Sequence, residues 1–210
     1  MSDSITRREL LKAAGIAGAA AIVGTEAFSA TGEAAQSPAA AGTLTSAEYE
    51  IVQAIFSRIV PSDANGPGAT EAQAARYIDR ALGGALASIR PAYTAGIAAI
   101  DAYAQVSRGT SFARLSASDQ DAVLTDMQEN RATGFTPDSE SFFNLVRAHA
   151  IQGVFSDPFY GGNANFAGWD LIGYPGVRTA VSANQQRMDA KVAPNHRSAY
   201  DFGMFSKGEL

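Results

Sequence analysis

Few side chains in this sequence have the chemistry of a catalytic or metal site. The chain has two histidines, His149 and His196, and no cysteine. It therefore has no thiol nucleophile, disulfide, thiolate-bound cluster or covalent haem attachment. His149 follows apolar residues with helical spacing, so we expect a hydrogen-bonded core histidine. His196 lies in a polar segment and is expected to be solvated. Ligation of a b-type haem by both would require the apolar helix and the tail to meet.

The carboxylates give no clear catalytic pair. Asp157 precedes Pro158, and Asp63 lies in a turn-rich stretch, so both are expected to cap turns. Glu140 and Asp157 could supply the acid and base of a hydrolase, but no spacing singles them out. The sequence has no G-x-S-x-G, H-E-x-x-H or dinucleotide-binding motif, and residues 161–163 lack the lysine and hydroxyl of a phosphate loop. We predict no catalytic, cofactor-binding or metal-binding residue on this chain.

A different kind of site is indicated by residues 156–176, where large aromatic rings are set among glycines. This stretch is too glycine-rich for a helix and too irregular for a strand. Loops normally stay polar, so such rings either pack into their own domain or anchor a partner, and one loop can do both. The predicted partner-interface residues are Phe159, Tyr160, Asn163, Trp169 and Tyr174, joined by Tyr200, Phe202 and Phe205 near the C-terminal end.

Five amphipathic helices are expected to position this stretch, because apolar residues recur with helical spacing between turn signals. The ranges are about 45–60, 70–82, 91–106, 116–127 and 137–154. Thr45 with Glu48 has the spacing of a capping box, and Thr70 with Gln73 repeats it. No segment alternates long enough to form a strand. We predict an all-α fold: a single helical domain of about five helices, an aromatic glycine-rich loop and an extended C-terminal arm.

The N-terminal residues resemble an export signal. Arg7 and Arg8 precede a mildly apolar run, residues 13–24. A helix of that length spans about 18 Å, far less than the hydrocarbon core of a membrane. The run therefore resembles the core of a twin-arginine signal peptide, and the mature chain is expected in the periplasm. We assign residues 1–41 to signal and linker, 42–176 to the helical domain and 177–210 to the arm.

Charge and composition limit the partners. The chain carries 16 basic and 21 acidic residues, which gives no support to nucleic-acid binding, since that requires a basic surface. The arm, residues 177–210, has few large apolar side chains apart from the aromatic residues near its end. Ordering it would cost about 1–2 kcal/mol per residue. We therefore expect the arm to be disordered alone and ordered on a partner.

Several segments together resemble a known family. They are Arg7-Arg8, the helix end at 58–61, residues 65–72 and 77–79, and the longest block, which runs from His149 through 157–163 to 168–169 and 171–176. In these segments the chain resembles the small (gamma) subunit family of gluconate 2-dehydrogenase, which is shared by related membrane-associated flavoprotein dehydrogenases of sugars and polyols. The resemblance covers about residues 44–178.

The resemblance implies a non-catalytic subunit that binds a large FAD-containing dehydrogenase subunit, with a multihaem cytochrome c subunit completing the complex. This chain would be the export escort and structural partner, FAD and haem c would sit on the other subunits, and membrane contact would be indirect. This would explain why a chain with few cofactor ligands of its own carries a twin-arginine signal: the cofactor that is exported belongs to the partner. The alternative is a free-standing periplasmic helical enzyme or ligand-binding protein that uses the loop around Tyr160 and His149 as a pocket.

Overall fold

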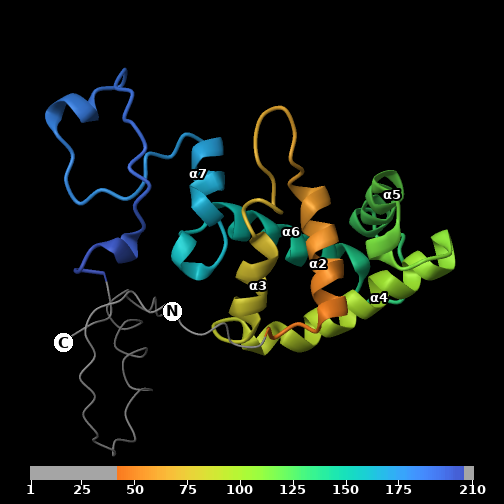
Figure 1. Ribbon diagram of the computed structural model, residues 1–210. Coiled ribbons are helices and arrows are strands. Elements are labelled where there is room, and N and C mark those ends of the chain that lie inside the picture. Colours follow the sequence, from red (N-terminus) through yellow and green to blue (C-terminus); the bar gives the residue numbers. More distant parts are fainter. Residues whose placement is uncertain (1–41, 206–210) are drawn as a thin grey trace, which may run out of the picture. The chain divides into compact units, whose positions relative to one another are not determined.

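The computed structural model describes residues 42–205 of the chain. That part is helical, with a single isolated bridge between Asp63 and Gly66 and no strand. The predicted all-α fold is thus confirmed (Figure 1). The helices are α2 Ser46–Ile59, α3 Ala74–Leu82, α4 Arg90–Arg108, α5 Ala117–Gln128, α6 Ser139–Phe155 and α7 Ala167–Leu171, with short 3-10 segments at Ala87–Ile89, Phe112–Arg114, Pro158–Tyr160, Ala164–Phe166, Ala183–Gln186 and Ala199–Asp201.

Two helices organise the packing. Helix α2 packs against α3, α4, α5 and α6, while α6 packs against α2, α3, α5 and α7. Figure 1 shows α2 and α3 in front of α6, with α4 running beneath them. The inner face of α4 is buried and has the helical spacing that the sequence predicted. Its buried residues are Tyr93, Gly96, Ile97, Ile100 and Ala104. One continuous apolar core therefore joins α2, α3, α4, α5 and α6.

The predicted start of α2 is confirmed. Thr45 Oγ1 accepts from the Glu48 backbone N–H at 3.3 Å, and the Glu48 carboxylate accepts from the Thr45 N–H at 2.8 Å. These two bonds satisfy donors that a helix start leaves unpaired. Glu48 also forms an ion pair of 2.8 Å with Arg90 at the start of α4. The Glu48 carboxylate thus caps the start of α2 and links it to the start of α4.

Some predicted boundaries differ from the structure. Helix α3 begins at Ala74 instead of Thr70, because Gln73 takes a left-handed conformation with φ 53° and ends the preceding turn. Helix α6 begins at Ser139 instead of Pro137, because the Asp138 side chain caps it by accepting from the Ser141 N–H at 2.7 Å. In both places the backbone conformation or the cap sets the helix boundary, and the spacing of apolar residues does not reveal where it lies.

No helix within residues 42–205 is long and apolar enough to cross a membrane. The predicted export residues Arg7 and Arg8, with the rest of residues 1–41, lie outside the described part of the chain, as do residues 206–210.

Candidate partner interface

The aromatic stretch, residues 156–176, folds onto the C-terminal end of α6. Two of its glycines allow a very close approach. A Cβ on Gly162 would collide with the Gly153 carbonyl, and one on Gly168 would collide with the Val154 carbonyl. Only glycine fits where two backbones come this close. The stretch also contains α7, which corrects the expectation that it would hold no helix.

Asn163 was predicted to face a partner, but the structure buries it completely. Its Nδ2 donates to the Ser156 carbonyl at 2.9 Å, and its Oδ1 accepts from the Gly168 N–H at 2.8 Å. Its backbone is left-handed, with φ 46°. Asn tolerates that conformation better than most residues. The structure therefore assigns Asn163 to holding the stretch in shape.

Trp169 was also predicted to face a partner and is instead part of the interior, with 6% of its surface exposed. Its Nε1 donates to the Phe155 carbonyl at the end of α6, at 2.9 Å. The ring centroid lies 5.4 Å from that of Phe166 and 4.7 Å from that of Tyr174. A buried indole needs an acceptor, and the carbonyl supplies one. Trp169 is thus an internal anchor.

Phe159 and Tyr160 are predicted interface residues that stay open in the structure, with 50% and 46% of their surfaces exposed. Tyr200 stacks on Phe159 with ring centroids 3.7 Å apart, and its hydroxyl lies 2.7 Å from that of Tyr160. The structure therefore brings together aromatic residues that the sequence places some forty positions apart. We call Phe159, Tyr160 and Tyr200 the aromatic cluster.

Asp157 fastens the arm beside this cluster. It accepts from the Phe159 N–H at 2.9 Å, which confirms the predicted turn cap. The same carboxylate accepts from Ser198 Oγ at 2.6 Å and from the Ala199 N–H at 2.8 Å. Ser198 is buried. The arm was expected to be disordered without a partner, but these hydrogen bonds hold residues 198–199 against the domain. Composition alone does not reveal such contacts.

His196 was expected to be solvated, but it has two partners in the structure. Its Nε2 lies 2.8 Å from the Asp170 carboxylate at the end of α7. Its ring stacks on Phe166 with centroids 5.0 Å apart. His196 remains about half exposed. It is a second fastening point between the arm and the aromatic stretch.

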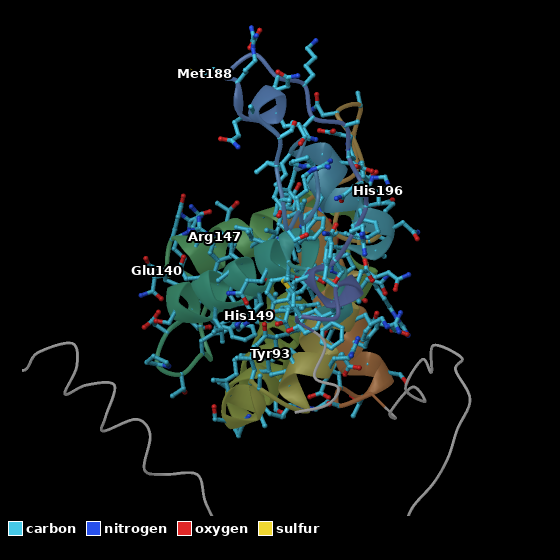
Figure 2. All side chains as sticks on the ribbon, turned by 90° about the vertical axis from the view of Figure 1, so that its left-hand side faces the viewer. Tyr93, Glu140, Arg147, His149, Met188 and His196 are labelled. Carbon is cyan, nitrogen blue, oxygen red and sulfur yellow. The ribbon has the colours of Figure 1, made fainter. Side chains whose placement is uncertain are left out.

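The arm leaves and rejoins the domain at one place. The Val177 N–H donates to the Arg197 carbonyl at 3.0 Å, and the Asn195 N–H donates to the Pro175 carbonyl at 3.1 Å. Residues 178–194 therefore form a loop with a closed base, visible in blue in Figure 1. Its residue Met188 is fully exposed, and Figure 2 shows it at the outer end. A short 3-10 segment, Ala183–Gln186, lies within this loop.

The remaining predicted interface residues lie at the edges of this region. Tyr174 is 38% exposed and meets the edge of Trp169. Phe202 lies under the Arg197 guanidinium, whose carbon is 3.9 Å from the ring centre. Phe205, at the end of the described chain, is about half exposed. These rings offer apolar surface without forming one cluster with Phe159.

His149 is a core histidine, as predicted. It is buried, and its Nδ1 lies 2.7 Å from the Tyr93 hydroxyl across α4 and α6 (Figure 2). Burial lowers the pKa of His149 and raises the pKa of Tyr93, so both side chains are neutral. Figure 2 shows His196 well apart from His149, so the two do not meet as haem ligands.

The carboxylates that could have formed a catalytic pair are far apart. Glu140 lies in the first turn of α6 and Asp157 lies two residues beyond its last residue, so a helix about 25 Å long separates them. Asp63 caps its own turn by accepting from the Asn65 N–H at 2.7 Å, as predicted. Within residues 42–205, no group of three or more His, Asp or Glu residues could hold a metal ion.

A surface hollow of about 380 Å³ lies beside the aromatic cluster. It is lined by residues of α3, of the segment after it, of the end of α6 and by one residue of the cluster: Tyr77, Arg80, Ala81, Ala85, Leu86, Gln152, Ser156 and Tyr160. His149 is not among them, which corrects the expected pocket around Tyr160 and His149. Sequence reasoning missed the other lining residues, because the turn after α3 and the end of α6 meet only in the fold.

The fold and surface define a small all-α protein in which an aromatic stretch, a fastened arm and a hollow lie side by side. The model of the family described as gluconate 2-dehydrogenase subunit 3 matches residues 46–176, more than half of the chain. The chain belongs to this family, and the resemblance seen in the sequence is confirmed. The match ends at Gly176, where the arm begins. Comparisons with curated proteins and with solved structures gave no match.

Proposed function

We propose that this chain is the non-catalytic small subunit of a gluconate-type, FAD-dependent sugar or polyol dehydrogenase complex. It binds the large flavoprotein subunit and escorts it through the twin-arginine pathway to the periplasm. FAD belongs to the flavoprotein and haem c to a multihaem cytochrome c subunit, and this chain meets the membrane only indirectly, through the complex. The observation that carries the proposal is membership of the subunit 3 family over residues 46–176.

Two features of the structure support a binding role. The side chains with the most reactive chemistry are engaged inside the chain: His149 with Tyr93, and Asp157 with the turn and the arm. Large aromatic side chains, by contrast, are exposed at Phe159 and Tyr160. Aromatic residues are enriched at protein interfaces because they bury a large area and lose little side-chain entropy. The molecule thus offers more for a protein partner than for a substrate.

Export of the partner tests the escort role. The variant Arg7→Lys with Arg8→Lys should leave both this chain and the co-expressed flavoprotein in the cytoplasm, as cell fractionation with antibodies to each would show. The matched control makes the same change twice outside the signal, at the exposed residues Arg76 and Arg114, and should be exported normally. Normal periplasmic levels of flavoprotein with the signal variant would contradict the escort role.

A free-standing ligand-binding protein is the second candidate, and the hollow beside Tyr160 is the observation that favours it. Purification of the tagged chain from the periplasm separates the two candidates. A subunit should leave with a yellow, FAD-containing partner in equal amount, whereas a free binder should leave alone.

A further inference from the structure

We infer that the hollow beside the aromatic cluster receives one bulky apolar side chain of the flavoprotein subunit, and that a neighbouring carboxylate of that subunit pairs with Arg80. This inference rests on the proposed function and adds to it the surface and the chemistry of docking. The observations that carry it are the hollow, Arg80 at its edge, which forms no ion pair within residues 42–205, and the exposed rings next to it.

The walls of the hollow suit an apolar side chain. Most of its lining residues are apolar or aromatic, namely Ala81, Ala85, Leu86, Tyr77 and Tyr160. Its volume of about 380 Å³ lies at the small end of the range for ligand pockets. Side chains that anchor an interface bury themselves in such hollows and contribute most of the binding free energy.

The polar groups of the hollow indicate what should accompany that side chain. Arg80 donates to the Phe159 carbonyl at 3.3 Å, and in the described part of the chain no carboxylate forms an ion pair with it. A guanidinium has five donors and pairs well with a carboxylate.

The position of the hollow favours a protein over a small molecule. Tyr160 both lines the hollow and belongs to the exposed part of the aromatic cluster. An anchor in the hollow would therefore continue into contacts with Phe159, in the arrangement of a buried centre and a surrounding rim that protein interfaces have. Arg80 lies between the two, because its guanidinium reaches the Phe159 carbonyl.

Two substitutions with matched controls test the inference on the full chain co-expressed with its flavoprotein. Ala85→Trp fills the hollow from an exposed position, and Ala87→Trp adds the same side chain at an exposed position outside it. Arg80→Glu reverses the charge at the hollow, and Arg76→Glu does so one turn away on α3. Circular dichroism and melting temperature confirm that each variant folds, and interferometry with the purified flavoprotein measures capture.

We expect Ala85→Trp and Arg80→Glu each to weaken capture by roughly tenfold or more, with the two controls close to wild type. Capture by both test variants at the strength of their controls would overturn the docking site while leaving the subunit role intact. Failure of the wild-type chain to capture the flavoprotein would instead reject the proposed function, and with it this inference. Equal losses in test and control variants would show that the hollow has no special role and would also overturn the inference.

Discussion

At the scale of single residues, the side-chain amide of Asn163 holds together two parts of the glycine-rich aromatic stretch. It bonds the Ser156 carbonyl just after α6 and the Gly168 N–H in α7. Because Asn163 is completely buried, water cannot replace these bonds when they are lost. One amide thus determines how the aromatic stretch presents its exposed rings.

Asn163→Ala should lower the free energy of unfolding by about 2–3 kcal/mol more than Asn165→Ala does, since it leaves buried polar groups without partners. Asn165 is a close control: its backbone is also left-handed, with φ 54° against 46°, but its side chain is exposed. Replacing it should cost about 1 kcal/mol through the backbone alone. Urea unfolding of both variants gives the comparison. Equal losses would mean that the bonds of Asn163 contribute nothing.

Residue types in the aromatic stretch were visible in the sequence, but their directions were not. Asn163 and Trp169 were predicted to face a partner and are buried, whereas Phe159 and Tyr160 from the same stretch are exposed. No periodicity sorts inward from outward residues where the backbone turns at every few positions. These directions are set by the close backbone contacts of Gly162 with Gly153 and of Gly168 with Val154 on α6, which the pattern of residue types does not show.

At the scale of helices, the ion pair between Glu48 and Arg90 links the start of α2 to the start of α4. Burial, the largest influence on Glu48, would raise its pKa, but the hydrogen bonds from Arg90 and Thr45 outweigh it and lower the pKa. The ionised carboxylate is therefore more favourable in the folded than in the unfolded chain. Its contribution to stability is complete above the ordinary pKa of 4.5 and is lost as pH falls below it.

Glu48→Gln should therefore destabilise the protein at pH 7 and make its melting temperature fall less steeply between pH 5 and about pH 3. Glu50→Gln on the same helix is the control, because Glu50 is exposed and forms no ion pair within residues 42–205. Calorimetry over that range measures both. If the melting temperature fell equally steeply with decreasing pH in Glu48→Gln and in wild type, the role of the ion pair would be contradicted.

Helices were predictable where their signals are local. The caps at Thr45 and Ser116 lie within three residues of their partners, and the buried faces of α4 and α5 follow from spacing alone. The start of α3 was missed because Gln73 takes a left-handed conformation that no capping pattern predicts. The fastening of the arm was missed because Asp157 and Ser198 meet across forty-one positions.

At the scale of the whole molecule, the proposed division of labour places every cofactor on other subunits. The isolated chain should then bind no flavin, haem or metal in stoichiometric amount. Its two histidines are engaged by Tyr93 and Asp170, and it has no thiolate to offer. An absorbance spectrum and metal analysis of the purified chain check this. One cofactor per chain would contradict the proposed subunit role and favour the free-standing alternative.

The closed base of the loop 178–194 has a practical consequence. Because Pro175 and Val177 are bonded to Asn195 and Arg197, changes at the outer end of the loop need not disturb the hollow or the aromatic cluster. Met188 is fully exposed there, and the sequence has no cysteine. Met188→Cys would thus give the chain a single thiol for a fluorescent label. Such a label could follow arrival of the flavoprotein in real time without touching the surface on which it docks.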